Sequence, residues 1–264
     1  MYFKYIYYHI VYQSILFNFL MKYKISVVSY LNTIPFVYAL QQFGFEDIVE
    51  ISLDMPSVCA EKLIHENVDI GLVPIVVLKQ MKNPYIISDF CIGANGAVDT
   101  VCLFSDVPIH KIKTIFLDYQ SRTSVELLKV LLDEYWRISP EMLLSKAGYE
   151  DDIKGNKAGL IIGDRAFQYQ NKFEYTYDLA DVWKLYTGLP FVFACWIANK
   201  KIENSFQLEF NKALSFGVDN INKAIDLIGG DYHSNISNDY LNNKISYQLD
   251  DEKRNAMQLF LEKI

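Results

Sequence analysis

Short runs of consecutive apolar residues recur along the chain, each bounded by turn-forming residues. Their apolarity is continuous and does not alternate, which is typical of strands that are covered on both faces. The pattern predicts six strands, over residues 24–31, 69–77, 97–105, 113–118, 158–164 and 189–199.

Helical patterns lie between several of these runs. Residues 55–68 have a proline near their start, and residues 123–136 place Leu127, Leu128 and Leu131 at helical spacing. Strands that alternate with helices favour an α/β fold, and we expect mainly parallel sheets.

The pattern changes after about Asn199. Residues 206–228 and 250–264 are amphipathic and predict two helices, with no strand expected between them. We expect these helices to pack back onto the first half of the chain.

Composition limits the class of protein. Of 264 residues, 51% are hydrophobic and 22% are charged, which is ordinary for a folded globular chain. The net charge of −7 argues against a nucleic-acid binder, since such proteins usually carry a basic surface. An anionic ligand would therefore have to be attracted by a local site.

The cysteines are widely spaced and each lies in an apolar context. Cys59, Cys91, Cys102 and Cys195 predict buried thiols in a reducing compartment, and neither disulfides nor a Cys-x-x-Cys metal site. With four histidines in the chain, we expect no histidine-based metal site.

The first twenty residues are rich in Tyr, Phe and Ile. Polar residues interrupt this run at Lys4, Gln13, Ser14 and Asn18, which disfavours both a secretory signal and a membrane-spanning helix. We expect a natural start at Met21, with residues 1–20 as an extension. An uncleaved membrane-associating helix is the alternative.

The predicted strands end on residues that can bind a ligand. In open α/β sheets ligands gather at the carboxyl ends of strands, and here these ends carry hydroxyls, amides and glycines. They include Ser29, Asn32, Thr100, Ser121, Gly163 and Asp164. No catalytic triad, His-Glu-x-x-His motif or glycine-rich phosphate loop is present. These residues therefore predict a two-lobed α/β binder of a small anion.

Each candidate also has a purely structural interpretation. Thr123 and Glu126 have the spacing of a capping box. The same helix start could instead offer hydroxyls, free N–H groups and its dipole to a carboxylate. Asn32 and Asp164 could satisfy local turns or contact a ligand. At this point both interpretations stay open.

Five ordered blocks carry a family resemblance: "VSYLNTIPF", "DIGLVPI", "SRTSVELLKVLL", "GLIIGDRAF" and "DLADVWKLYTGLPFVFACWIA". Together they resemble the MqnA family, the chorismate dehydratases of the futalosine route to menaquinone. The resemblance runs from about Met21 to Ile197 and beyond.

The resemblance implies the two-lobed α/β fold of type 2 periplasmic binding proteins, with a ligand cleft between the lobes. Residues 21–105 and 197–264 would form one lobe and residues 106–196 the other, with crossings near Ser105 and Trp196. It also implies a cytoplasmic monomer or homodimer that needs no cofactor. Its partner would be the small molecule chorismate, with no nucleic acid and no stable membrane association.

The implied reaction converts chorismate to 3-[(1-carboxyvinyl)oxy]benzoate and water. Asn32 would be catalytic and contact the leaving hydroxyl or the enolpyruvyl group. The substrate's own side-chain carboxylate would accept the C3 proton, since no matched block supplies a histidine or lysine base. The expected substrate-binding residues are Ser29, Thr100, Ser121, Thr123, Ser124 and Asp164.

Two other functions stay open. One is a non-catalytic small-anion binding protein of the same fold. The other is the sister enzyme MqnD, 1,4-dihydroxy-6-naphthoate synthase, which is similar in fold but carries a histidine where this chain has Gly163. Asp99 is a departure from the expected pattern, because an inward carboxylate would repel a dianion. We expect strand alternation to turn Asp99 away from the Thr100 side.

Overall fold

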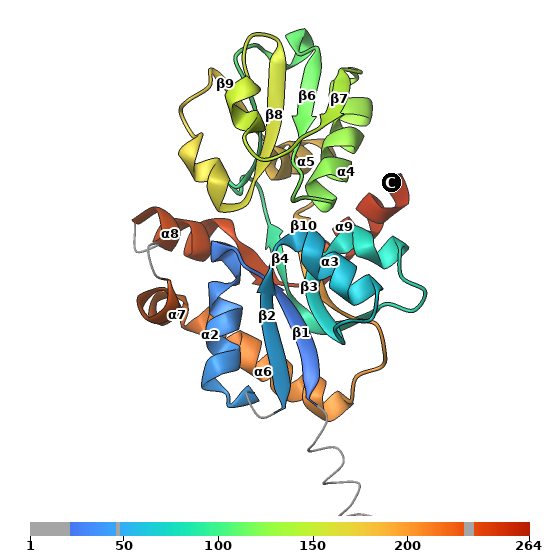
Figure 1. Cartoon of the computed structure of the whole chain (residues 1–264), viewed down its shortest axis with the longest axis vertical. Coiled ribbons are helices and arrows are strands. Elements are labelled where there is room, and N and C mark those ends of the chain that lie inside the picture. The colour runs from blue at the N-terminus through green and yellow to red at the C-terminus, as the bar shows by residue number, and fades with distance from the viewer. Residues whose placement is uncertain (1–21, 46–47, 230–234) are drawn as a thin grey trace, which may run out of the picture.

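The structure is a computed structural model that describes residues 22–45, 48–229 and 235–264. Figure 1 shows two parts stacked along the long axis, each built around its own sheet. The expected start at Met21 and the extension over residues 1–20 lie outside the described residues.

The lower part in Figure 1 contains a six-stranded sheet in the order β11-β4-β10-β3-β1-β2. Strand β1 pairs in parallel with β2 and β3, whereas β10 is antiparallel to both β3 and β4. Strand β11 is antiparallel to β4. The strands are β1 (Tyr23–Val28), β2 (Val49–Asp54), β3 (Ile70–Pro74), β4 (Tyr85–Ala94), β10 (Phe191–Ala198) and β11 (Ser246–Gln248).

The upper part contains a five-stranded sheet in the order β7-β6-β8-β5-β9. Strand β6 is parallel to β7 and β8, and β5 is antiparallel to β8 and β9. The strands are β5 (Val101–Ser105), β6 (Thr114–Leu117), β7 (Glu141–Leu144), β8 (Lys157–Ile162) and β9 (Tyr175–Asp178).

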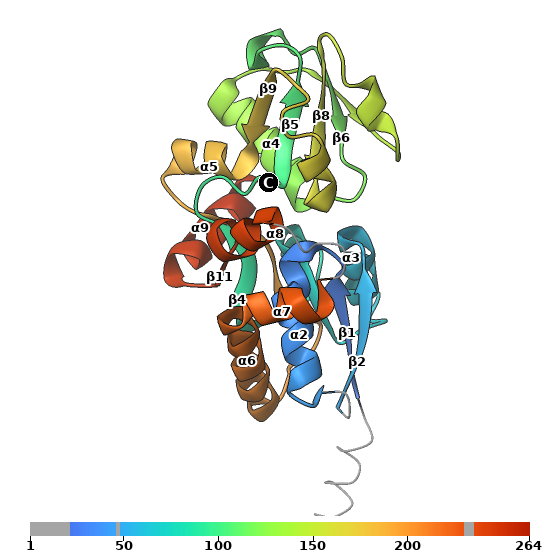
Figure 2. The same cartoon turned by 90° about the vertical axis from the view of Figure 1, so that its left-hand side faces the viewer.

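Helices cover the sheets. Figure 2 shows α2, α6 and α7 together beside the six-stranded sheet, and these three helices contact one another. Helix α3 packs on β1 and β3, and α4 continues beyond Val130 as a π-helical turn. The helices are α2 (Ile34–Gln42), α3 (Pro56–Ile64), α4 (Thr123–Val130), α5 (Leu179–Thr187), α6 (Asn204–Asp219), α7 (Ile221–Ile228), α8 (Asn235–Asp239) and α9 (Asp251–Lys263).

Aromatic side chains from distant segments join the lower part into one core. Phe36 of α2 and Phe210 of α6 both meet Trp196 of β10, with ring centroids 5.7 and 4.9 Å apart. All three side chains are fully buried and the pairs are edge-to-face, the geometry that aromatic quadrupoles favour. Helices α2 and α6, which are far apart in the sequence, therefore pack on the same strand.

All six predicted strands are confirmed, as β1, β3, β5, β6, β8 and β10. The expectation of mainly parallel sheets is wrong, because four of the described pairings are parallel and five are antiparallel. Continuous apolarity reports burial on both faces and says nothing about strand direction. The same run fits a buried strand of either sense.

The C-terminal segment also differs from the expectation. Helices are confirmed over most of residues 206–228 and 250–264, although the first pattern is divided into α6 and α7 at Asn220. The expectation of no strand between them is wrong, since β11 pairs with β4 there. Three residues are too few to show a period of two.

Strand pairing moves both expected crossings. Strand β5, which ends at Ser105, already pairs in the five-stranded sheet, so the first crossing precedes Val101. Trp196 lies inside β10 of the six-stranded sheet, so the second crossing precedes Phe191. An apolar run predicts a strand without showing which sheet it joins. The assignment of chain segments to two domains stays a prediction.

The cysteines are buried and free, as predicted. Burial raises the pKa of the Cys59 thiol to about 11 and that of Cys195 to about 12, so both stay protonated at neutral pH. Across the residues that the structure describes, no helix is both long and apolar enough to cross a membrane.

Candidate active site

A cleft opens where the two sheets face each other, and it encloses about 580 Å³ including its mouth. Both parts line it: Val28 and Pro74 lie at the carboxyl ends of β1 and β3, and Ile162 lies at the end of β8. The polar side chains in the lining belong to Tyr30, Asn32, Thr100, Ser121, Thr123, Ser124 and Tyr240.

A tight turn after β1 brings Asn32 to the cleft. The hydroxyl of Thr33 lies 2.6 Å from the carbonyl oxygen of Val28 and 2.8 Å from that of Tyr30, which fixes the turn. One 3-10 turn over Leu31–Thr33 follows, and Pro35 sits in the first turn of α2, where its missing N–H is harmless. The apolar strand therefore stops at Val28, and Asn32 can face a ligand.

Asn32 is held by two tyrosines from the C-terminal segment. Its Nδ2 donates to Tyr240 Oη at 3.3 Å, and its backbone carbonyl accepts from Tyr247 Oη at 3.1 Å. Tyr240 Oη also lies 2.8 Å from Thr100 Oγ1. Among the described residues, Asn32 Oδ1 is buried without a hydrogen-bond partner. A buried amide oxygen normally has a partner, so this one is available to a ligand.

The segment before Thr100 is anchored to Asp178. The backbone N–H groups of Val98 and Asp99 donate to Asp178 Oδ2 at 2.8 and 2.6 Å, and its other oxygen caps α5. Burial raises the pKa of Asp178 to about 6, so at neutral pH it is ionised and accepts these bonds.

Asp99 turns away from the cleft, as expected, but for a different reason. Its carboxylate lies 3.1 Å from Lys244 Nζ, and Asp99 is not among the lining residues. It precedes β5, and its φ of +64° places it in the left-handed region. A turn, and not strand alternation, therefore directs this carboxylate away from Thr100.

The other wall of the cleft is the start of α4. The hydroxyl of Ser121 accepts the N–H of Ser124 at 3.0 Å. The predicted capping box is wrong, because Thr123 caps nothing and Glu126 pairs with Lys129 at 2.8 Å. Among the described residues, Thr123 Oγ1 is buried without a hydrogen-bond partner. Thr123 lines the cleft, so its hydroxyl is available to a ligand at the start of the helix.

Among the described residues, the lining of the cleft contains no Asp, Glu, His, Lys or Arg. The nearby guanidinium groups are engaged elsewhere. Arg122 pairs with Glu61 and donates to Gln80 at 3.0 Å, and Arg165 binds Asp118 and Glu150. An anion in this cleft would therefore be bound by neutral donors and the helix dipole.

Two residues, Tyr30 and Leu31, join the walls at the turn after β1. The Tyr30 hydroxyl donates to Gln120 Oε1, and a Cβ on Gly163 would lie 2.8 Å from the Tyr30 ring. The N–H of Leu31 donates to the two carboxylate oxygens of Asp164 at 3.1 and 3.2 Å. Gly163 has a φ of +66°, so conformation and space both favour glycine there.

Five of the seven residues predicted for the site line the cleft: Asn32, Thr100, Ser121, Thr123 and Ser124. Ser29 is exposed and lines a different depression beside α2. Asp164 lies outside the lining and holds the turn that carries Asn32. Their roles toward a substrate stay predictions.

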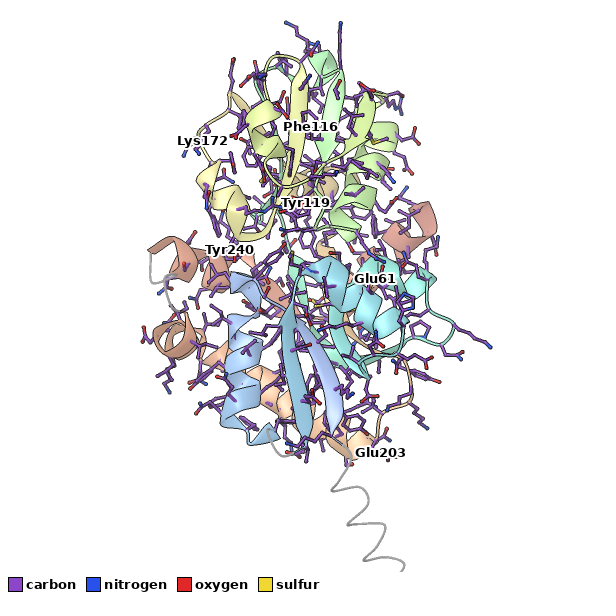
Figure 3. All side chains as sticks on the ribbon, viewed as in Figure 1. Glu61, Phe116, Tyr119, Lys172, Glu203 and Tyr240 are labelled. Atoms are coloured by element: carbon purple, nitrogen blue, oxygen red, sulfur yellow. The ribbon has the colours of Figure 1, made fainter. Side chains whose placement is uncertain are left out.

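Sequence reasoning missed Tyr240 and Tyr30. Tyr30 adjoins Asn32, so its position at a strand end was an available signal. Tyr240 follows residues 230–234 in a segment without a clear period, and only the fold brings it to Asn32 and Thr100. Figure 3 shows Tyr240 in the lower part and Tyr119 in the upper part, on facing sides of the junction.

A family model described as "Menaquinone biosynthesis" matches residues 23–264. The chain belongs to this menaquinone biosynthesis family. It is also similar to the chorismate dehydratase of Thermus thermophilus, with 28% identity over 193 residues, covering 66% of this chain and 69% of the relative. Family membership indicates an enzyme of menaquinone biosynthesis that acts on a small molecule.

Solved structures share the fold. Protein AF1704 of Archaeoglobus fulgidus has a TM-score of 0.71 at 15% identity, covering 92% of this chain and 96% of that one. The Candida albicans CA3427 gene product, with the generic periplasmic binding protein fold, scores 0.63 at 14% identity, covering 92% and 90%. The Escherichia coli aliphatic sulphonate binding protein SsuA scores 0.57 at 14%, covering 91% and 85%. The expected two-lobed α/β fold of periplasmic binding proteins is confirmed.

Proposed function

We propose that this member of the menaquinone biosynthesis family is a chorismate dehydratase. As a carbon-oxygen lyase it would convert chorismate to 3-[(1-carboxyvinyl)oxy]benzoate and water. One observation carries the proposal: two buried polar atoms without described partners, Asn32 Oδ1 and Thr123 Oγ1, belong to opposite walls of one uncharged cleft. The family match and the similar chorismate dehydratase of Thermus thermophilus support it.

The start of α4 would bind a substrate carboxylate. Ser121 Oγ accepts a bond from the Ser124 N–H, so its own proton is available to donate, and the Thr123 hydroxyl is not engaged. Both lie where the positive end of the helix dipole attracts an anion. A carboxylate here would gain hydrogen bonds without a neighbouring cation.

Asn32 and Thr100 would face the reacting part of the substrate. Loss of the C3 proton and cleavage of the C4–O bond give an aromatic ring and one water, so no oxidant or reductant is required. The chain has to orient the substrate and to stabilise the departing hydroxyl by preorganised hydrogen bonds. Asn32, with its available Oδ1, is suited to accept a hydrogen bond from that hydroxyl and to orient it. The Thr100 hydroxyl is suited to donate to its oxygen as the C4–O bond breaks.

The substrate itself would accept the C3 proton. Among the described lining residues there is no carboxylate, imidazole or amine. The two lining tyrosines, Tyr30 and Tyr240, have pKa values raised by burial, so neither is a phenolate at neutral pH. The enolpyruvyl carboxylate of chorismate is the remaining base within reach of C3. The proton that it accepts passes to the departing hydroxide, which leaves as water, and the carboxylate is restored.

The comparisons do not favour the two alternative functions. Gly163 adds a physical argument against the naphthoate-forming sister reaction, since a side chain at residue 163 would overlap the Tyr30 ring. We further propose that the protein acts in the cytoplasm as a monomer or homodimer.

The full chain mixed with chorismate tests the proposal, with product followed by chromatography and mass against an enzyme-free control. We expect an aromatic ether lighter than chorismate by one water. Unchanged chorismate in the presence of folded protein would contradict the dehydratase. Conversion of cyclic de-hypoxanthine futalosine would instead favour the sister activity.

A further inference from the structure

The hydroxyl of Tyr240 lies at the junction of the two polar groups that face the reacting part of the cleft. It is 3.3 Å from Asn32 Nδ2 and 2.8 Å from Thr100 Oγ1. The side chain is 1% exposed, and its ring meets Phe167 edge-on with centroids 5.1 Å apart. Tyr240 is therefore held between Asn32, Thr100 and Phe167 with little freedom to move.

A count of protons links the two contacts. A phenol has one proton and two lone pairs, and here it accepts the N–H of Asn32. Its own proton is then free to be donated to Thr100. The Thr100 hydroxyl then has its own proton to donate. Among the described residues, its contact besides Tyr240 is the Val98 carbonyl oxygen at 3.5 Å, the limit for such a bond. A ligand oxygen would be a better acceptor.

The same bond sets the orientation of the Asn32 amide. With Nδ2 on Tyr240, Oδ1 is left as an acceptor without a described partner. Were the amide reversed, Tyr240 would have to donate to Oδ1 and could no longer donate to Thr100. The Tyr240 hydroxyl thus fixes two things together: which end of the Asn32 amide is left as an acceptor, and whether Thr100 accepts a bond and keeps its own proton to donate.

We infer that Tyr240 is a positioning residue, which holds Asn32 as an acceptor for the substrate hydroxyl and Thr100 as a donor to a substrate oxygen. The inference rests on the proposed dehydratase function and deepens it. Tyr240 transfers no proton to the substrate in this account. Burial raises its pKa, which keeps it a neutral phenol throughout the reaction.

Tyr240→Phe tests the inference, because it removes the hydroxyl and keeps the ring that packs on Phe167. We expect kcat for chorismate to fall about tenfold to a hundredfold, with KM changed less than threefold because the α4 wall is intact. Tyr177→Phe is the matched control: it removes a hydroxyl that accepts the Ile109 N–H at 2.8 Å and belongs to a residue outside the cleft lining. We expect its kcat to stay within twofold of wild type.

A double-mutant cycle separates a positioning role of Tyr240 from a nonspecific loss of structure. Thr100→Val should lower kcat. Adding Tyr240→Phe to Thr100→Val should lower kcat much less than Tyr240→Phe does in wild type, because either change already breaks the hydrogen bond between the two hydroxyls. Melting temperatures of all variants show whether each one is folded. Tyr247→Phe, which removes the bond to the Asn32 backbone, should have a smaller effect than Tyr240→Phe.

The outcomes of the two proposals are distinct. If wild-type protein turns chorismate over and Tyr240→Phe stays within twofold of it, the inference fails and the dehydratase stands. Additive losses in the cycle would also overturn the inference, because Tyr240 and Thr100 would then act independently. If wild-type protein leaves chorismate unchanged, the proposed function fails and takes the inference with it.

Discussion

The two walls of the cleft differ in how their polar groups are prepared for a ligand. On the wall after β1, the Asn32 side chain is fixed by Tyr240, which also bonds Thr100. On the wall at α4, the Thr123 hydroxyl has no described partner and Ser121 uses only an acceptor site. The first wall is a connected network, and the second is a set of separate donors at a helix terminus.

This difference suggests a division of labour. A network that fixes the direction of each hydrogen bond suits the reacting atoms, where catalysis depends on geometry. Separate donors at a helix start suit a carboxylate, which accepts several bonds and tolerates variation in their direction. In this account the first wall controls kcat and the second controls binding.

Asn32→Ala should have the largest effect. Loss of the amide removes the acceptor that orients the departing hydroxyl, and we expect kcat to fall about 10²-fold, the cost of a misplaced reacting group. Steady-state kinetics with chorismate check it. Asn243→Ala is the control, because Asn243 is exposed and its amide bonds Asp239. Wild-type turnover by Asn32→Ala at saturating chorismate would remove Asn32 from the mechanism.

Thr123→Val should have the next largest effect, and it should change KM and not kcat. It keeps the shape of the side chain and removes the hydroxyl, so we expect KM to rise about tenfold while kcat changes little. Thr123→Ser, which restores a hydroxyl, should regain most of the affinity. A fall in kcat with unchanged KM would show that the two walls are not divided as proposed.

Gly163→Ala tests the place where the walls touch. The new Cβ would lie 2.8 Å from the Tyr30 ring at a φ of +66°. Gly155 has a similar φ of +61° and nothing within 4 Å, so Gly155→Ala measures the backbone strain alone. Denaturant unfolding should show about 1 kcal/mol lost in Gly155→Ala and about 1–3 kcal/mol more in Gly163→Ala. An equal loss of unfolding free energy in the two variants would mean that the Tyr30 ring does not limit the space at residue 163.

The pH dependence should give the smallest effect. Below about pH 6 Asp178 becomes protonated and accepts the Val98 and Asp99 N–H groups less well, so we expect kcat to fall severalfold between pH 7 and pH 5. Asp178→Asn should have a low kcat with a flatter profile over this range. A wild-type profile that is flat from pH 7 to pH 5 would contradict a role for ionised Asp178.

The stability readout for Asp178 has the opposite sign. Its pKa in the folded chain is raised above the ordinary value of 3.8, so the folded state binds this proton more tightly than the unfolded chain. Its contribution to the free energy of unfolding therefore grows as pH falls from about 6 toward 3.8. Unfolding curves of wild type and Asp178→Asn over that range should show the difference, and the loss of kcat is then not a loss of fold.

The local pattern of apolar residues predicted the strands and helices of this protein better than it predicted which strands pair. The apolar runs located six strands because burial on both faces leaves a continuous signal, as in residues 158–164, which contain most of β8. Direction and sheet membership depend on contacts far along the chain, which is why the crossings were misplaced.

The site shows the same limit. Asn32, Thr100 and Thr123 could be predicted because each lies at a strand end or helix start, where the fold class directs ligands. The capping box failed because Ser121, two residues earlier, took the role assigned to Thr123. Tyr240 carried no local signal, since its partners are 208 and 140 residues away in the sequence.

The most direct test of the two-wall account is a crystal structure of the full chain with 3-[(1-carboxyvinyl)oxy]benzoate. We expect the product in the cleft, with one carboxylate within hydrogen-bond distance of Thr123 Oγ1 and Ser121 Oγ. The ring carbon that carried the hydroxyl should face Asn32. A product bound outside this cleft, or with its carboxylates at Asn32 and its bare ring edge at α4, would contradict the account.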